Sequence, residues 1–222
     1  MTDIKGIIFD LDGTLIDTIE DIGNSVNAVL EDYGYPTYTK DEYKLMVGHG
    51  FMNLIKNAMP EGLKEDQYEE GLLKFTYYYD KLYMDTTHPY EDIYDLLKEL
   101  NRRGIKIAVN SNKQDDYTKK LIEHCFKEVD FVDVIGSRNN IPNKPDPTSA
   151  LEIIDKMKLA KDEVLYIGDS ETDIKTGKNA NLKTIGVSWG FRSVEVLENV
   201  CADVIVDKPQ DILTYLERNI KL

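Results

Sequence analysis

The residues best suited to chemistry lie near the start of the chain, where Asp10 and Asp12 follow a short apolar run. That run, residues 4–9, is rich in β-branched and aromatic side chains, which is typical of a strand buried in a parallel sheet. Because side chains alternate along a strand, both carboxylates project to the same side and can reach one point beyond its end. Gly13 then permits a sharp turn, and Thr14 adds a hydroxyl group.

Two simpler interpretations of these acids are possible. Paired carboxylates beside a turn are often only a solvated strand end, and other parts of the chain must decide against that reading. A calcium loop of the EF-hand type is the other acidic alternative, but it follows a helix and carries glycine at its sixth position. Here Gly13 comes directly after Asp12 and the segment follows a strand, so we set the calcium loop aside.

Composition limits the classes of protein that are possible. The chain has 222 residues, 41% of them hydrophobic, and no apolar run of the roughly 18 residues that would span a membrane. We find no secretory signal at the N-terminus, so we expect a cytoplasmic protein. The formal net charge of -14 argues against a nucleic-acid partner, which would need a concentrated basic face. Cys125 and Cys201 lack metal-site spacing and are expected to be reduced thiols.

The chain has two kinds of periodicity. Residues 17–86 follow helical spacing throughout, with a capping box at Thr39–Glu42 and a helix stop at Gly34. From residue 89 onward helices and strands alternate, which predicts a parallel sheet covered on both faces. After the first strand, the further predicted strands are residues 105–109, 131–135, 164–167, 184–187 and 204–206, and a last helix runs over residues 211–220.

This pattern predicts a doubly wound α/β core with an inserted all-helical cap. We assign residues 1–16 and 87–222 to the core and residues 17–86 to the cap. Right-handed crossovers place all strand carboxyl ends at one edge of the sheet, which is where open α/β sheets bind ligands. Asp10, Ser111 and Asp169 follow three different strands, so we expect them to meet at that edge.

Four short motifs occur along the chain, in this order: Asp10-Leu11-Asp12-Gly13-Thr14, Ser111, Lys144 in the segment 143–147, and Gly168-Asp169 with Asp173. Singly they carry little information, but together, at strand ends and spread over the chain, they make coincidence improbable. The set resembles the motifs of the haloacid dehalogenase (HAD) superfamily of phosphohydrolases. The resemblance implies a Rossmann-like core and a phosphatase activity. One departure is Ser111-Asn112-Lys113, preceded by the polar Asn110, where related phosphatases commonly carry threonine first.

The resemblance also implies catalytic roles. Asp10 would attack phosphorus and form an aspartyl-phosphate, and Asp12 would transfer protons to the leaving oxygen and from the attacking water. Lys144 would supply positive charge for the phosphate and the nucleophile, and Ser111 a hydroxyl donor. For Ser111 and Lys144, a turn serine and a solvated loop lysine are the plain alternatives.

Magnesium (Mg2+) is the expected cofactor, because it prefers hard oxygen ligands and usually keeps water and substrate oxygens. By resemblance, its ligands would be the Asp10 carboxylate, the Asp12 backbone carbonyl and the Asp169 carboxylate. Asp173, at the start of a helix, would orient bound waters or Lys144 rather than ligate directly.

The expected partner is a small phosphorylated metabolite, with no nucleic acid and no membrane, and the oligomeric state is left open between monomer and dimer. The segments 47–58 and 188–191 resemble phosphoglycolate phosphatase-like proteins, so 2-phosphoglycolate is the first candidate substrate. A pyrophosphatase, a sugar-phosphate phosphatase or phosphomutase, and a phosphate-binding regulatory protein remain alternatives. The candidate substrate-binding residues are Gly13, Thr14, Asn112, Lys113 and His49.

Overall fold

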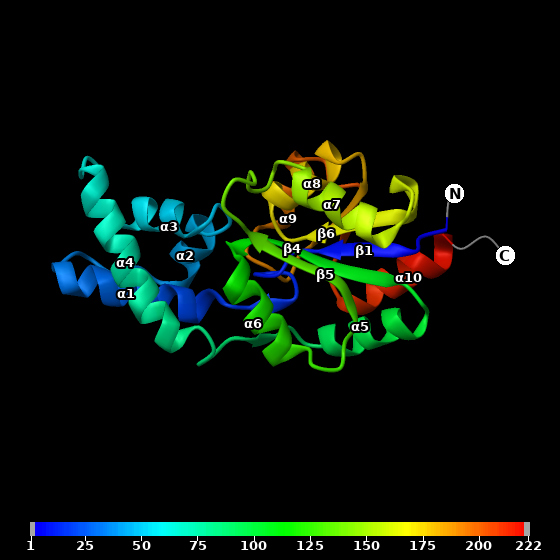
Figure 1. The fold of residues 1–222 in the computed structure, drawn as a ribbon, viewed down its shortest axis with the longest axis horizontal. Coiled ribbons are helices and arrows are strands. Elements are labelled where there is room, and N and C mark those ends of the chain that lie inside the picture. The colour runs from blue at the N-terminus through cyan, green and yellow to red at the C-terminus, as the bar shows by residue number, and fades with distance from the viewer. Residues whose placement is uncertain (1–2, 220–222) are drawn as a thin grey trace. The chain divides into compact units, whose positions relative to one another are not determined.

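The computed structural model describes residues 3–219, which form two compact units (Figure 1). One unit consists of Met1–Ile16 and Pro89–Leu222, and the other of Asp17–His88. The predicted second boundary, between residues 86 and 87, lies two residues before the observed one. The helical unit keeps Thr86 and Thr87 because their N–H and hydroxyl groups donate to the Asp21 carboxylate at 2.7–3.1 Å.

The larger unit is built on a six-stranded sheet in which neighbouring strands run parallel, in the order β5-β4-β1-β6-β7-β8. Its strands are β1 (Gly6–Phe9), β4 (Lys106–Gln114), β5 (Phe131–Ser137), β6 (Val164–Gly168), β7 (Lys183–Val187) and β8 (Val204–Val206). All residues of β1 are buried, as expected for a strand covered on both faces. The predicted doubly wound α/β core is confirmed.

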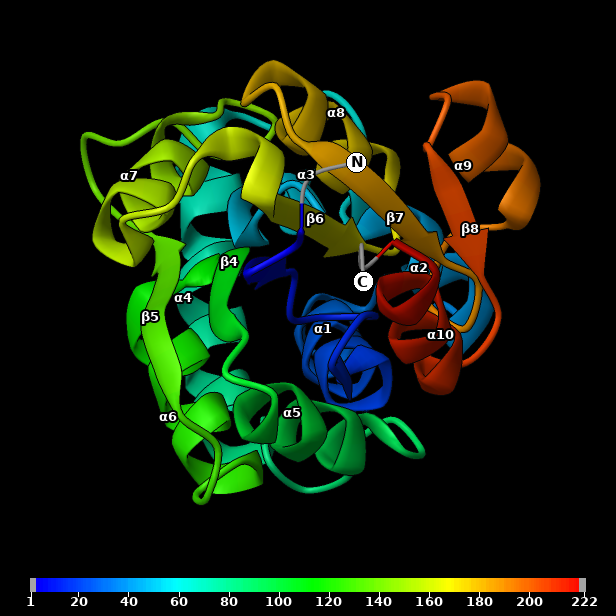
Figure 2. The same ribbon diagram turned by 90° about the vertical axis from the view of Figure 1, so that its right-hand side faces the viewer.

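Helices cover both faces of this sheet (Figures 1 and 2). On one face lie α7 (Thr148–Met157) and α8 (Glu171–Asn179), and on the other α5 (Ile93–Arg102), α6 (Asp115–Cys125) and α10 (Pro209–Asn219). The predicted end of the last helix, Ile220, lies outside the described residues. The short helices α9 (Val194–Asn199) and η1 (Lys161–Glu163) were not predicted, because segments of six and three residues are too short to show helical periodicity.

The smaller unit contains four helices, as its periodicity predicted: α1 (Ile19–Tyr33), α2 (Lys40–Met46), α3 (Phe51–Ala58) and α4 (Glu65–Leu82). The predicted stop at Gly34 is confirmed by its left-handed backbone, with φ 69°. The capping box is also confirmed, since Thr39 N–H donates to Glu42 Oε2 at 2.7 Å. Two short strands that were not predicted, β2 (Ile16–Asp17) and β3 (His88–Pro89), pair where the chain passes between the units.

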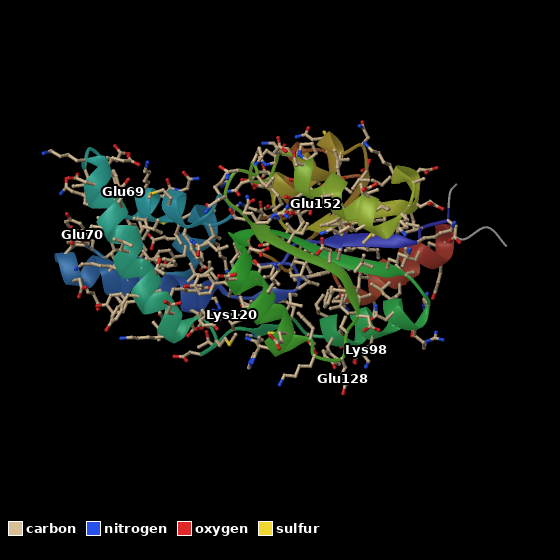
Figure 3. All side chains as sticks on the ribbon, viewed as in Figure 1. Glu69, Glu70, Lys98, Lys120, Glu128 and Glu152 are labelled. Atoms are coloured by element: carbon tan, nitrogen blue, oxygen red, sulfur yellow. The ribbon has the colours of Figure 1, made fainter. Side chains whose placement is uncertain are left out.

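The surface of the larger unit carries many charged pairs, and Figure 3 labels several of their members. Lys98 donates to Glu128 at 3.1 Å, and Arg138 to Glu152 at 2.6 Å. The Lys98–Glu128 pair is exposed, and pairs of that kind contribute at most about 1 kcal/mol each. Among the residues that the structure describes, no helix combines the length and the apolar character needed to cross a membrane.

Candidate active site

The polar residues found by sequence follow strands that end at one edge of the sheet. Asp10 comes directly after β1 and Asp169 directly after β6, and these two strands are hydrogen-bonded neighbours. The Asp10 N–H donates to the Ile167 carbonyl at 2.9 Å, which extends the pairing of the two strands by one residue. Because β4 lies on the other side of β1, the chain leaves the centre of the sheet in both directions. This is the switch point at which doubly wound sheets form their ligand sites.

Three carboxylates form a buried cluster at this point. Asp10, Asp169 and Asp173 each offer one oxygen within 4.8 Å of the others, and their exposed fractions are 6%, 2% and 0%. Gly168 makes this approach possible, because a Cβ atom there would lie 2.3 Å from Asp173 Cβ. Buried acids at such distances repel one another unless a cation lies between them. The all-oxygen donor set therefore fits a hard divalent cation such as magnesium.

Burial and the closeness of the three carboxylates raise the pKa of two of them, Asp169 and Asp10. Burial, together with the neighbouring Asp173 carboxylate, raises the pKa of Asp169 to about 7, although the Phe191 N–H and Arg192 act in the opposite direction. Burial also raises the pKa of Asp10 well above its ordinary value, with Asp173 adding to the effect and Lys144 opposing it. The pKa values of Asp10 and Asp169 therefore both lie above that of an isolated aspartate.

Lys144 lies between two of the acids. Its Nζ donates to Asp10 Oδ1 at 2.6 Å and to Asp173 Oδ1 at 2.7 Å, and its side chain is 5% exposed. Burial alone would lower the pKa of Lys144, but the Asp10 and Asp173 carboxylates outweigh it and hold the pKa well above its usual value. The ammonium group therefore stays charged inside the site.

The backbone of Lys144 is held by the neighbouring strand. Asn112 Nδ2 donates to the Lys144 carbonyl at 3.1 Å, and the Lys144 N–H donates to Asn112 Oδ1 at 2.8 Å. This reciprocal pair uses both ends of the Asn112 amide. These two bonds connect β4 to the loop that carries Lys144, and the predicted contact of Asn112 with substrate stays a prediction.

Strand β4 continues through the segment that the sequence placed in a loop. The strand was expected to end at Val109, but it runs on to Gln114 with an irregular register against β5. Asn110 is buried there because its Nδ2 donates to the Tyr166 hydroxyl at 3.1 Å, which satisfies a polar group in the sheet interior. Ser111 is also buried, and its Oγ accepts a hydrogen bond from the Lys113 N–H at 3.1 Å.

The turn after Asp12 packs closely against Asp169. Gly13 has φ +86°, and a Cβ atom there would lie 2.4 Å from Asp169 Oδ2, so no other residue fits without displacing the carboxylate. Thr14 is 1% exposed, and its hydroxyl has no hydrogen-bond partner among the described residues. Its carbonyl accepts from Trp189 Nε1 at 3.1 Å. The predicted contacts of Gly13 and Thr14 with substrate stay predictions.

Sequence reasoning assigned no site role to the segment after β7, although it noted residues 188–191 as a family feature. Besides the Trp189 contact, the Phe191 N–H donates to Asp169 Oδ2 at 2.6 Å. Arg192, 7% exposed at its side chain, donates to Glu171 at 3.0 Å. The segment therefore connects the loop after β1 to the loop after β6. The sequence offered one indication that this segment belongs to the site: it follows a predicted strand of the same sheet, residues 184–187.

We predict that Gly190→Ala weakens the binding of a divalent cation by about 10- to 100-fold, as changes around a metal ligand commonly do. A Cβ atom at this position would lie 2.2 Å from Asp169 Cβ and 2.4 Å from the Gly13 carbonyl oxygen, so the Asp169 carboxylate must move. Calorimetric titration of the purified variant with magnesium measures the change. Gly186→Ala, on the preceding strand, is the matched control, because its Cβ atom would meet only Leu197 Cδ1 within 3.4 Å, at 3.1 Å. Equal affinities in both variants would contradict the prediction.

The structure brings most of the predicted residues to one edge of the sheet, and two of them need separate comment. Lys113 was predicted to contact substrate, but its Nζ donates to Asp12 Oδ1 at 2.7 Å. His49 lies in the helical unit, exposed between α2 and α3, and its predicted contact with substrate stays a prediction. All the other predicted residues lie in the larger unit, at this edge of the sheet. They are Asp10, Asp12, Gly13, Thr14, Ser111, Asn112, Lys113, Lys144, Asp169 and Asp173.

The known proteins that this chain resembles are hydrolases, which agrees with the acidic site described above. The family model of haloacid dehalogenase-like hydrolases matches residues 7–187. A phosphoglycolate phosphatase of Aliivibrio fischeri is 30% identical over 220 residues, covering 96% of this chain and 97% of its own length. A phosphoglycolate phosphatase of Psychrobacter arcticus is 32% identical, with coverages of 95% and 94%. A solved structure from Lactobacillus delbrueckii subsp. bulgaricus, provisionally named a phosphoglycolate phosphatase, superposes with a TM-score of 0.91 at 30% identity, covering 97% of this chain and 99% of that one.

The chain belongs to the haloacid dehalogenase-like hydrolase family. It is an enzyme of the phosphoric monoester hydrolase class, as the order of its motifs predicted. The resemblance to the phosphoglycolate phosphatase-like subgroup is also confirmed, at about 30% identity over nearly the whole chain.

Proposed function

We propose that the protein is a magnesium-dependent phosphatase that hydrolyses a small phosphomonoester, with 2-phosphoglycolate as the best candidate, through an aspartyl-phosphate on Asp10. The observation that carries this proposal is Lys144, a buried ammonium bonded to both Asp10 and Asp173. Phosphoryl transfer requires an anionic carboxylate to approach an anionic phosphate, so catalysis consists largely of positioning and charge neutralisation. A lysine fixed between the nucleophile and a second acid supplies both.

In the first step, an oxygen of the Asp10 carboxylate attacks phosphorus, and the bond from phosphorus to the ester oxygen breaks. The leaving oxygen takes a proton from the Asp12 carboxyl group. Water then gives a proton to the Asp12 carboxylate and attacks phosphorus, which breaks the bond to Asp10 and releases inorganic phosphate. Lys144 and the Ser111 hydroxyl hold the phosphate oxygens during both steps, with Asn112 orienting the Lys144 backbone.

The residues present fit a bound magnesium ion. The Asp10 and Asp169 carboxylates and the Asp12 backbone carbonyl would hold it, with Asp173 supporting Lys144 and the ion's water molecules. When bound, the ion neutralises charge on the phosphate and relieves the repulsion within the acidic cluster. The Phe191 N–H and Gly190 keep Asp169 in the orientation that this requires.

We predict that magnesium binding strengthens as the pH rises toward about 7. Because the pKa of Asp169 is raised to about 7 by burial and by Asp173, the folded protein keeps a proton that the unfolded chain releases near pH 4. The metal-free protein therefore loses stability as the pH rises from about 4 to about 7, and metal binding in that range must release protons. Titration calorimetry in two buffers of different ionisation enthalpy measures the protons released, and Asp169→Asn should lower the number released per bound ion. A proton release that is zero at pH 6 would contradict the prediction.

Several related activities compete with this proposal. A pyrophosphatase or a sugar-phosphate phosphatase would use the same core, and a phosphomutase would need the helical unit to hold a bisphosphorylated intermediate. A phosphate-binding protein without turnover is the alternative outside enzymology. The phosphoglycolate phosphatases of Aliivibrio fischeri and Psychrobacter arcticus favour 2-phosphoglycolate among these choices. A small phosphorylated metabolite as partner and a cytoplasmic location remain predictions from the sequence.

A substrate screen tests the proposal. Purified protein with magnesium, and with a chelator in parallel, is assayed for phosphate release from 2-phosphoglycolate, pyrophosphate, sugar phosphates and nucleotides. We expect the largest kcat/KM for 2-phosphoglycolate and no release with the chelator. Preference for pyrophosphate or a sugar phosphate would overturn the substrate, and absence of any release would favour the phosphate-binding alternative.

A further inference from the structure

Two lysines of the site each hold one of the two acids that follow β1. Lys144 bonds to Asp10, and Lys113 Nζ donates to Asp12 Oδ1 at 2.7 Å. The Lys113 side chain is 1% exposed, whereas the Asp12 side chain is 18% exposed. Burying a lysine more deeply than the carboxylate it pairs with costs free energy on folding. An ion pair at the surface would form without that cost. This arrangement calls for a reason beyond stability.

The backbone around Lys113 is held on three sides. Its N–H donates to Ser111 Oγ at 3.1 Å, and its carbonyl accepts from Thr118 Oγ1 at 3.2 Å. A Cβ atom at Gly136 would lie 2.6 Å from the Lys113 carbonyl oxygen, so β5 packs directly against this point of β4. The sheet therefore fixes the backbone from which the Lys113 side chain extends. That side chain is 1% exposed, and its Nζ reaches Asp12 Oδ1 at 2.7 Å.

We propose that Lys113 is a positioning residue that holds the Asp12 carboxyl group in the orientation needed for proton transfer to the leaving oxygen. The inference rests on the proposed function, in which Asp12 transfers protons. It replaces the sequence-based prediction that Lys113 binds substrate. Proton transfer is steeply sensitive to geometry, and general acid–base groups contribute about 10²- to 10⁴-fold to rate.

The consequence depends on the leaving group. An alkyl alcohol such as the one in 2-phosphoglycolate leaves only when it receives a proton, whereas p-nitrophenolate leaves without one. Lys113→Met should therefore lower the single-turnover rate for the alkyl ester by about 10²-fold. The first release of p-nitrophenolate from p-nitrophenyl phosphate should change little. Inhibition by inorganic phosphate should keep its wild-type constant, because Lys113 does not bind the phosphoryl group.

Two further variants control for other effects. Lys113→Arg keeps a cationic donor and should restore most of the lost rate on the alkyl ester. Lys106→Met removes a lysine at the opposite end of the same strand, where its Nζ donates to the Met157 carbonyl at 2.6 Å, and should leave both rates unchanged. Equal loss on both esters, or a weaker inhibition by phosphate, would overturn the proposal and return Lys113 to substrate binding.

A crystal structure of Lys113→Met tests the same point without any activity. We expect the Asp12 side chain to leave its wild-type orientation in this variant and to keep it in Lys113→Arg. An Asp12 carboxylate that stays in place in Lys113→Met would overturn the inference, even if the protein hydrolyses phosphomonoesters as proposed. Inactivity of the wild type on every ester would instead overturn the proposed function.

Discussion

Asp10→Asn is expected to lower phosphate release by at least about 10³-fold, because an amide oxygen cannot form the aspartyl-phosphate. The variant should fold normally. It removes one of three buried acids within 4.8 Å of one another, and Lys144 keeps its bond to Asp173. We therefore expect its melting temperature without metal to equal or exceed that of the wild type, since less like charge is buried.

Steady-state assays with magnesium and the best substrate from the screen, together with thermal melts, measure both effects. Asp133→Asn is the matched control, because Asp133 on β5 also accepts a hydrogen bond from a lysine, Lys156, at 2.6 Å. The control should retain wild-type activity. If Asp10→Asn hydrolysed the substrate at a rate near that of the wild type, Asp10 would not be the nucleophile.

Lys144→Met is expected to damage both activity and stability. Loss of the ammonium leaves Asp10 and Asp173 facing each other without their shared cation, and removal of one partner from a buried ion pair costs about 3–5 kcal/mol. The charge that meets the phosphate also disappears, which should lower kcat by about 10²- to 10³-fold. Urea unfolding and steady-state kinetics give the two values.

Lys156→Met is the control for this variant. Lys156 also contacts two carboxylates, Asp133 at 2.6 Å and Glu152 at 3.2 Å, but its side chain is 47% exposed. Such a pair contributes at most about 1 kcal/mol, so this substitution should change stability little and activity not at all. Equal losses of stability in the two variants would show that burial of Lys144 has no special importance.

The sequence was most informative where chemistry and secondary structure coincide. Asp10 and Asp169 each follow a short apolar strand, and the parallel order of such strands was enough to predict that they meet at one edge. Gly34 and the Thr39–Glu42 capping box are local signals that depend on nearby residues only. As predicted, Gly34 ends a helix and the capping box begins the next one. The four motifs then predicted a phosphohydrolase of the haloacid dehalogenase family.

Contacts between distant parts of the chain could not be predicted in the same way. The bond from Lys113 to Asp12 joins residues 101 positions apart, and no spacing rule indicates it. The Phe191 N–H that meets Asp169 is a backbone group, which carries no residue-specific signal. Strand β4 was predicted too short because Asn110 looked like the start of a loop, whereas its amide is satisfied by Tyr166 from a strand far along the chain. Each of these contacts depends on the order of the strands in the folded sheet.

The central claim is that the phosphoryl group passes through a covalent bond to Asp10. The most direct measurement starts from the protein turning over substrate in the presence of magnesium. The reaction is stopped during turnover, the protein is reduced with borohydride, and the modified residue is located by mass spectrometry of peptides. Borohydride converts an aspartyl-phosphate to homoserine, so we expect homoserine at position 10 and unchanged aspartate at position 12. Rapid phosphate release with both residues unmodified, or modification at any other residue, would contradict it.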